Sequence, residues 1–318
     1  MKAVLQHRAS AGFRNELARV APEWLQISVV DEADKAGFFG AMQDAEVLLH
    51  VLEPVTAEAI ARAPKLRLIQ KIGVGLNTID LEAARTRGIA VANMPGTNSQ
   101  AVAELTLSLM LAALRCIPYL DREIRAGRGW HLPVDTFDRM GEIGGRTVGL
   151  IGYGEVPRRL APALAALGAR VVYTSRAPKP DAIADAMTLA ELLSTSDIVS
   201  LHVPLTTETE KLINEKTIAR MKRGSVLVNT ARGRLVDEDA LIAALRSGRI
   251  LAAGLDVFFD EPALAQHPLY ALDNVVLTPH VAWLTRETLQ RSMGVAIENC
   301  RRLAQRQRLL HEVIPERQ

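Results

Sequence analysis

The stretch Arg146–Arg176, RTVGLIGYGEVPRRLAPALAALGARVVYTSR, decides how the middle of this 318-residue chain folds. Its β-branched start predicts a strand over Thr147–Ile151 that runs directly into a Gly-Tyr-Gly turn. A helical pattern follows and ends at Gly168, and a second strand is predicted over Arg170–Tyr173. Strand, glycine turn, helix and strand in this order predict a βαβ unit that binds a dinucleotide.

The glycine turn has a physical reason at each position. Gly152 permits the tight turn after the strand, and Gly154 lets backbone N–H groups at the helix start approach a pyrophosphate. The residues predicted to bind the cofactor here are Gly152, Tyr153, Gly154, Glu155 and Val156. The alternative is a tight turn that binds no ligand.

Two residues depart from the usual pattern of this turn. Pro157 occupies the position of the third glycine, where the first turn of a helix tolerates proline because that N–H has no helical partner. Glu155 brings a carboxylate close to the expected diphosphate, so we expect its side chain to point to solvent.

The same alternation of strands and helices extends over the rest of the chain, which predicts parallel strands joined by crossover helices. Strands are predicted in a first lobe over Lys2–Leu5, Val47–Val51, Leu68–Ile72 and Ile89–Ala92. In a second lobe they are predicted over Thr147–Ile151, Arg170–Tyr173, Ile198–Leu201, Val226–Asn229, Ala252–Asp256 and Val275–Leu277. The fold class is therefore α/β, with two Rossmann-like domains one after the other.

Two further segments read as long helices. Ser99–Arg115 is apolar nearly all round, so we expect it to be buried between domains or subunits. Glu287–Leu310 is basic and follows the last strand of the second lobe, and we expect it to cross back and complete the first lobe.

The composition is that of a globular protein: 48% of the residues are hydrophobic, 23% are charged and the net charge is +2. Because basic and acidic residues are nearly matched, we expect neither a nucleic-acid partner nor an acidic membrane partner. The N-terminus lacks an apolar signal region and no apolar run approaches 18 residues, so a cytoplasmic protein is expected. Cys116 and Cys300 lack a CxxC neighbour or a nearby histidine, which predicts two buried thiols in helices and no metal site.

Three segments of the second lobe place ionisable residues after apolar strands. They read VLVNTARGRLVDE (226–238), AAGLDVFFDEP (252–262) and VVLTPHVAW (275–283). The C-terminal ends of parallel strands converge on the ligand crevice, so Arg232, Glu261 and His280 are predicted to meet there. Taken singly, these residues have plainer explanations as a surface arginine, a turn residue before a proline and a strand-end histidine.

These segments, together with GYGEVP (152–157) and HVPLTTETEKLI (202–213), resemble the D-isomer-specific 2-hydroxyacid dehydrogenase family. In the first lobe, GVGLNTIDLEAARTRGIAVANMPGTNSQAVAEL (73–105) is similar to the substrate-domain signature of that family. Asn77-Thr78 stands where the family commonly has Asp-Asn, so we expect altered hydrogen bonds in that loop.

The resemblance implies a two-domain layout. Residues 1–97 and 286–318 would form a flavodoxin-like substrate (catalytic) domain, and residues 98–285 would form a doubly wound cofactor domain. The family is usually dimeric, which predicts a homodimer here, with Ser99–Arg115 as a suitable interface.

The resemblance also implies a role for each ionisable residue that the chemistry supports. Reduction of a 2-oxo acid needs a hydride at the carbonyl carbon and a proton at the developing alkoxide. His280 suits the general acid because imidazolium titrates near neutral pH, and Glu261 suits its partner because a carboxylate orients the ring and favours its charged form. Arg232 suits the substrate clamp, because a guanidinium binds a carboxylate through two parallel hydrogen bonds.

Further contacts follow from the same resemblance. Backbone N–H groups of Val74 and Gly75 would bind the other side of the substrate carboxylate. Trp283 is expected to reach the pocket and limit its volume, or alternatively to pack at an interface. Asp256 would hold the nicotinamide carboxamide. The remaining predicted cofactor contacts lie at other strand ends and are His202, Pro204, Thr209 and Thr230.

The end of the second strand of the βαβ unit indicates which dinucleotide is bound. An acidic residue there binds the ribose hydroxyls and repels a 2′-phosphate, but this chain has no acid before Asp181. Ser175 and Arg176 suit a phosphate instead, with Lys179 adding positive charge, so we expect NADPH in preference to NADH. The alternative is that Arg176 is a solvated loop residue that leaves the protein indifferent to the phosphate.

The expected substrates are glyoxylate and hydroxypyruvate, the second giving D-glycerate. A formate dehydrogenase is disfavoured because Glu261 stands where those enzymes carry Gln, and a phosphite dehydrogenase because Val74 stands where that relative has Lys. The alternative from another class is a nicotinamide-sensing corepressor-like protein with weak or no turnover. It is disfavoured because such relatives carry extra tails for partner binding.

Overall fold

The computed structural model describes residues 1–314 and divides the chain into two compact units. Unit 1 consists of Met1–Asn98 and the segment from Leu284 onward, and unit 2 consists of Ser99–Trp283. The predicted domain boundaries follow residues 97 and 285, close to these divisions. The predicted substrate domain runs to residue 318, and its positions 315–318 lie outside the described residues.

Unit 1 is built on a six-stranded sheet with the order β13-β5-β4-β3-β1-β2. Its strands are β1 (Lys2–Gln6), β2 (Gln26–Val30), β3 (Val47–His50), β4 (Leu68–Lys71), β5 (Ala90–Ala92) and β13 (Glu312–Ile314). Neighbouring strands are parallel, except that β13 pairs antiparallel with β5. The order of β1 to β5 is that of flavodoxin-like folds.

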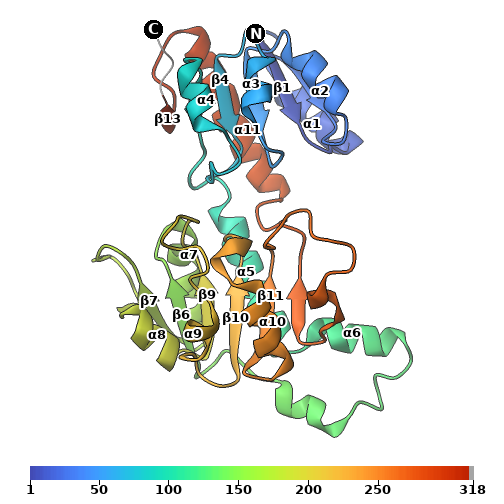
Figure 1. Ribbon diagram of the computed structural model, residues 1–318, viewed down its shortest axis with the longest axis vertical. Helices are drawn as coiled ribbons and strands as arrows, with labels where there is room; N and C mark the ends of the chain where they lie inside the picture. The colour runs from blue at the N-terminus through green and yellow to red at the C-terminus, as the bar shows by residue number, and fades with distance from the viewer. Residues whose placement is uncertain (315–318) are drawn as a thin grey trace. The chain divides into compact units, whose positions relative to one another are not determined.

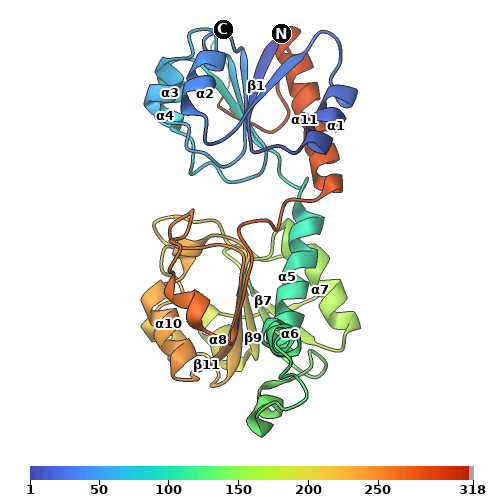
Figure 2. The same ribbon diagram turned by 90° about the vertical axis from the view of Figure 1, so that its right-hand side faces the viewer.

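Helices cover both faces of this sheet, as Figure 2 shows. One face carries α1 (Ala11–Val20) and α11 (Arg286–Ala304), and the other carries α2 (Lys35–Met42), α3 (Ala57–Ala61) and α4 (Leu81–Thr86). The buried amide of Gln70 in β4 accepts a hydrogen bond of 2.6 Å from Asn299 of α11. The C-terminal helix therefore completes the first lobe, as the sequence predicts.

Unit 2 is built on a seven-stranded parallel sheet with the order β12-β11-β10-β9-β6-β7-β8. Its strands are β6 (Thr147–Ile151), β7 (Arg170–Thr174), β8 (Asp185–Ala186), β9 (Ile198–Leu201), β10 (Ser225–Asn229), β11 (Ile250–Leu255) and β12 (Val275–Leu277). The first six strands of this unit have the order of the Rossmann fold, whose switch point lies between β6 and β9. The two doubly wound sheets confirm the predicted α/β fold class.

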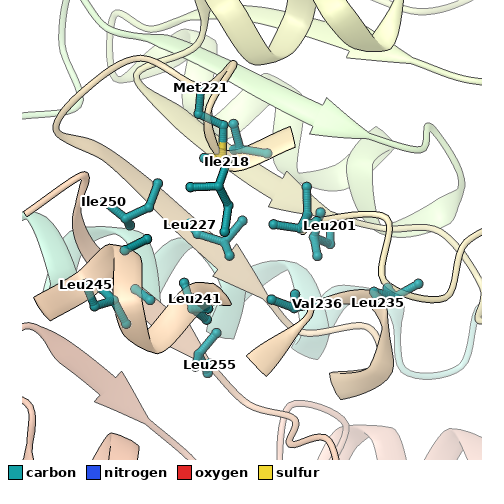
Figure 3. Close-up of a cluster of buried hydrophobic side chains, with 14 of the residues drawn as sticks. Leu201, Ile218, Met221, Leu227, Leu235, Val236, Leu241, Leu245, Ile250 and Leu255 are labelled. Atoms are coloured by element: carbon teal, nitrogen blue, oxygen red, sulfur yellow. The ribbon is translucent and has the colours of Figure 1, made fainter. Parts of the chain in front are cut away.

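Two hydrophobic clusters fill the two faces of this sheet. One lies under α8 (Leu189–Thr195), α9 (Glu215–Ile218) and α10 (Glu238–Arg246). Figure 3 shows side chains of α9 and α10, such as Ile218 and Leu241, next to Leu227 of β10. The other lies under α5 (Ser99–Leu114) and α7 (Glu155–Ala166). Figures 1 and 2 show these two helices side by side on the sheet. The remaining helices are α6 (Ile117–Arg125) and the short 3₁₀ segments η1 (Val134–Arg139), η2 (Gly233–Leu235) and η3 (Pro268–Ala271).

The apolar helix α5 is buried for a different reason from the one that the sequence suggested. Its residues Leu109, Met110 and Leu114 lie in the cluster between α7 and the sheet of unit 2. The approach is so close that a Cβ on Gly254 of β11 would lie 2.8 Å from the Cβ of Leu109. The helix is therefore a core element of its own unit, which accounts for its apolar character without a second subunit.

Three strands, β2, β8 and β13, are not indicated by the sequence pattern. β8 has two residues and β13 has three, which is too few for a periodic signal, and β2 is half-exposed along its length. The predicted helix Glu287–Leu310 ends at Ala304, because Arg306 and His311 have φ angles of 53° and 51° and the chain turns back to form β13. Both cysteines are buried as predicted, but Cys116 lies in the left-handed turn before α6 rather than within a helix.

Within residues 1–314, no single helix is both long and apolar enough to cross a membrane. The helices α5 and α6 pass that test only when they are counted together, and a bend of 63° separates them.

Candidate active site

The turn between β6 and α7 requires glycine at its first position for two reasons. Gly152 has a φ of +100°, and a Cβ there would lie 2.5 Å from the carbonyl oxygen of His202 after β9. Gly154 is the N-cap of α7, and a Cβ there would meet nothing within 4 Å. An open cradle therefore lies in front of the N-terminus of a 12-residue helix, at the switch point of the sheet. These residues fit the pyrophosphate of a dinucleotide.

The departures from the glycine pattern are accommodated in the first turn of α7. Pro157 is buried at the third position of the helix, where a backbone N–H has no helical acceptor. The exposed carboxylate of Glu155 turns along the helix and pairs with Arg159 at 2.7 Å. The ring of Tyr153 is buried and packs on Tyr173, with the ring centroids 4.5 Å apart, so only its backbone remains at the turn.

The other predicted cofactor residues on this side have their side chains engaged within unit 2. His202 bonds to Ser200 at 2.9 Å, and burial lowers the pKa of its ring to about 3, so the ring is neutral. The Thr209 hydroxyl donates to the carbonyl oxygen of Pro204 at 2.6 Å and so holds its own loop together. The hydroxyl of Thr230 lies 2.8 Å from that of Thr106 in α5. The hydroxyl groups of Thr209 and Thr230 are thus already hydrogen-bonded within unit 2.

The end of β7 carries an exposed cation, and the first acid that follows it in sequence is paired. The Ser175 hydroxyl donates to the carbonyl oxygen of Ala177 at 2.5 Å, and Arg176 is exposed. Asp181 forms an ion pair with Arg158 of α7. The carboxylate near Arg176 is Glu208, whose pKa is lowered by the Thr206 hydroxyl and, to a smaller extent, by Arg176.

The ends of β11 and β12 bring the predicted acid and its partner together. Nδ1 of His280 lies 2.6 Å from Oε2 of Glu261, and the backbone N–H of Phe258 donates to Oε1 of Glu261 at 2.9 Å. Both carboxylate oxygens are thus held, and Nε2 of His280 is the ring nitrogen that the pair leaves for a substrate. Burial raises the pKa of the Glu261 carboxyl, but the contacts with His280, Phe258 and Arg232 outweigh it and lower the pKa overall.

Arg232 follows β10 and lies next to this pair. Its side chain is half-buried, and Nη1 donates to the carbonyl oxygen of Ala231 at 2.6 Å. Burial lowers the pKa of Arg232, and the charge of Glu261 partly opposes that shift. A half-buried guanidinium beside a carboxylate–imidazole pair can bind a small carboxylate anion through two parallel hydrogen bonds.

His280 has an unusual backbone conformation that Asp256 supports. The φ of His280 is 53°, and its N–H donates to the carbonyl oxygen of Asp256 at 2.7 Å. The buried carboxylate of Asp256 accepts bonds of 2.6, 2.9 and 2.9 Å from Thr278, Val281 and Ala282. Burial raises the pKa of Asp256 in spite of these three bonds. This carboxylate therefore anchors the loop that carries His280, a role that the sequence analysis did not foresee when it assigned Asp256 to the nicotinamide.

Trp283 also supports the histidine loop. Its indole N–H donates to the carbonyl oxygen of His280 at 3.1 Å, and its side chain is half-buried. The loop after β10 is fixed in a different way: a Cβ on Gly233 would lie only 1.8 Å from the carbonyl oxygen of Phe258. The loops that carry Arg232 and Glu261 therefore pack backbone to backbone. Sequence reasoning missed both Gly233 and Phe258, although a glycine directly after the arginine was a visible signal.

Val74 and Gly75 belong to unit 1, in the loop after β4. Gly73 has a φ of +133°, its carbonyl oxygen accepts from the N–H of Met94 at 2.8 Å, and Asn93 donates to the carbonyl oxygen of Val74 at 3.0 Å. The loop is thus fixed to the chain after β5, and the Val74 side chain is exposed. Their contact with a substrate carboxylate stays a prediction.

The comparisons with known proteins identify the family of this chain. Residues 107–282 match the family model described as D-isomer specific 2-hydroxyacid dehydrogenase, NAD binding domain. The chain belongs to this family. The matched residues make up most of unit 2, so unit 2 is the family's nicotinamide-dinucleotide-binding domain.

Individual members of the family are similar over most of the chain. A glyoxylate reductase of Aeropyrum pernix is 41% identical over 271 residues, which cover 83% of this chain and 81% of the relative. A D-3-phosphoglycerate dehydrogenase of Mycobacterium leprae is 38% identical over 92% of this chain, but the match spans only 54% of that relative's length. The solved structure of the TT0316 protein of Thermus thermophilus superposes with a TM-score of 0.88 at 38% identity, covering 99% of this chain and 100% of the other.

Proposed function

We propose that this dehydrogenase reduces a small 2-oxo acid to the D-2-hydroxy acid with a nicotinamide dinucleotide. The observation that carries the proposal is the His280–Glu261 contact of 2.6 Å beside the half-buried guanidinium of Arg232. A proton donor and a carboxylate clamp at neighbouring strand ends are what this reaction needs. The similarity to a protein named glyoxylate reductase supports the same reaction class.

The residues of the site divide the chemistry between them. Arg232 binds the substrate carboxylate and, by its charge, polarises the adjacent carbonyl. His280 donates a proton from Nε2 to the carbonyl oxygen as it becomes an alkoxide, while Glu261 holds Nδ1 and stabilises the charged ring before the transfer. The dinucleotide, when bound, supplies the hydride that reduces the carbonyl carbon and is itself oxidised.

The same proposal assigns a role to each of the two units. Unit 2 would hold the pyrophosphate on the backbone from Gly152 to Val156, and unit 1 would supply the Val74–Gly75 loop to the substrate carboxylate. The open cradle at Gly154 supports the first assignment, because a dinucleotide needs close approach of backbone N–H groups there.

We further propose glyoxylate and hydroxypyruvate as the preferred substrates. Trp283, whose ring is tied to the His280 carbonyl, is the bulky side chain nearest the proton donor in sequence and would limit the pocket. The test is a panel of 2-oxo acids with the purified protein. A kcat/KM for phenylpyruvate above that for both small acids would contradict the substrate proposal. Tight cofactor binding without turnover of any 2-oxo acid would favour the corepressor-like sensor instead.

NADPH is the proposed cofactor, because Arg176 is an exposed cation at the end of β7 and Asp181 is paired with Arg158. A charge-assisted contact with the 2′-phosphate is worth roughly 1.5–3 kcal/mol, which corresponds to a preference of about 10- to 150-fold. We expect Arg176→Ala to abolish most of the NADPH preference measured as a ratio of kcat/KM values. The matched control is Arg170→Ala at the opposite end of β7, where the arginine pairs with Asp185. A wild-type preference for NADH, or an unchanged ratio in Arg176→Ala, would contradict the proposal.

A homodimer remains part of the proposal, but its interface moves away from α5. The segment from α6 to η1 exposes large apolar side chains, and the most exposed are Ile117, Ile124, Trp130, Val134 and Phe137. An apolar surface of this kind is typical of protein interfaces. Sedimentation equilibrium of the wild type and of Trp130→Glu would test it, and a monomeric wild type would contradict it.

A further inference from the structure

Phe258 lies between the end of β11 and Glu261, and two rings enclose its side chain. The Phe258 ring is 9% exposed and meets the His267 ring edge-on, with centroids 5.7 Å apart and an interplanar angle of 76°. Tyr270 of η3 contacts both rings, at 6.4 Å from Phe258 and 5.4 Å from His267. Two residues that follow Glu261 in sequence therefore contribute to the packing of Phe258, which also belongs to the hydrophobic cluster under α8, α9 and α10.

The hydrogen bonds of His267 determine its tautomer. The backbone N–H of Leu269 donates to Nδ1 at 3.3 Å, so Nδ1 is an acceptor and the proton resides on Nε2. Nε2 lies 3.1 Å from Oε1 of Glu238, the first residue of α10. His267 is 9% exposed. Through its bond to Glu238 it links η3 to α10, the helix that follows the Arg232 loop.

Phe258 passes this constraint to the reacting groups through its backbone. Its N–H donates to Oε1 of Glu261 at 2.9 Å, and Oε2 of the same carboxylate contacts His280 at 2.6 Å. Its carbonyl packs against Gly233, next to Arg232. A rotation of the Phe258 peptide would remove the bond that fixes one oxygen of Glu261 and would turn the other away from His280.

We propose that His267 is a positioning residue: by enclosing Phe258 and bonding to Glu238, it orients the Glu261 carboxylate towards His280. The inference rests on the proposed function, in which His280 is the proton donor. Neither the family resemblance nor the chemistry of the site assigns a role to His267, whose side-chain partners are Glu238, Leu269 and the two neighbouring rings.

The charged groups around the two histidines define what a titration would report. Within unit 2, two charged groups face His280: Glu261 from the loop after β11, and Asp256 from the end of β11. Glu261 in turn faces Arg232 from the end of β10. His267 faces Glu238, while its other close neighbours are the rings of Phe258 and Tyr270. Loss of His267 therefore leaves all the charged groups near His280 in the chain and changes only their placement.

The test compares His267→Ala with the wild type by two measurements. NMR of histidine-labelled protein without cofactor follows the titration of His280, assigned by its loss in His280→Asn. The pH profile of kcat/KM for 2-oxo acid reduction follows the same group during turnover. We expect both midpoints to fall by about one pH unit in His267→Ala, because a carboxylate that is no longer held favours the charged ring less. We expect kcat to fall about tenfold and the KM for the cofactor to stay unchanged.

Two further variants separate positioning from mere stability. Thr188→Ala removes the cap of α8, beside β8 at the other edge of the sheet, and serves as the matched control that lowers the melting temperature without moving either midpoint. Glu238→Gln keeps an oxygen that accepts from Nε2 and should behave like the wild type. A lowered melting temperature in His267→Ala with unmoved midpoints would overturn the inference. A shifted NMR titration in a protein whose wild type reduces no 2-oxo acid would instead sustain the positioning and overturn the proposed function.

Discussion

Replacement of His280 by alanine is expected to lower kcat for 2-oxo acid reduction by roughly 10²–10⁴-fold, the usual range for loss of a general acid. The ring is held by Glu261 at 2.6 Å, and no other histidine contacts that carboxylate in the described part of the chain. Cofactor affinity, measured by quenching of tryptophan fluorescence, should stay the same because the pyrophosphate turn lies at the end of a different strand.

The pH profile makes this prediction specific. A general acid must be protonated, so kcat/KM for reduction should fall as the pH rises through the titration of His280, and the alanine variant should lack this limb. The control is His131→Ala, which removes an exposed histidine of the same unit. A His280→Ala variant with a near-normal kcat and the same limb would place the proton donor elsewhere.

Arg232→Ala is expected to damage both binding and turnover. The clamp contacts the carboxylate in the ground state and in the transition state, so KM should rise and kcat should fall together. Removing one partner of a buried charged contact costs about 2–5 kcal/mol, which corresponds to roughly 30- to 4,000-fold in kcat/KM. Arg232→Lys should recover only part of this loss, because an ammonium lacks the planar fork.

The stability of the Arg232 variants should not follow their activity. Burial lowers the pKa of Arg232, which means that the folded protein disfavours the charged guanidinium. We therefore expect its replacement to change the melting temperature much less than it changes kcat/KM. Arg234→Ala, two positions along the same loop, removes an exposed cation paired with Asp260 at 3.0 Å and should change kcat/KM little. Equal losses of activity in both variants would show that only the positive field of the loop matters.

The functional residues were accessible from sequence to different degrees. Arg232, Glu261 and His280 each follow a buried parallel strand, and strand ends of one sheet converge, so their meeting was predictable. Asp256 follows the same rule, yet its carboxylate is used by the three N–H and O–H donors of the His280 loop. Those donors reach Asp256 because His280 has a φ of 53°. No residue type in VVLTPHVAW indicates this backbone conformation.

The helix α5 illustrates the same limit for packing. Its apolar character predicts burial, but hydrophobicity alone does not name the surface that buries it. The absence of a side chain on Gly254 lets Leu109 of the helix lie directly on β11, which is distant from it in the chain. The sequence of α5 therefore could not distinguish a helix at an interface from a helix in the core of its own unit.

What the sequence determined by itself is the local structure. Periodicity placed most of the strands, Gly152 and Gly154 placed the dinucleotide turn, and the residues after the strands marked the site, because each signal spans a few neighbouring positions. The tertiary structure alone decided that Phe258 fixes Glu261, that His267 encloses Phe258, and that Gly233 brings the Arg232 loop against the Phe258 backbone. These contacts depend on the packing of the loops after β10 and β11 with the residue before η3, which a pattern read along one segment does not contain.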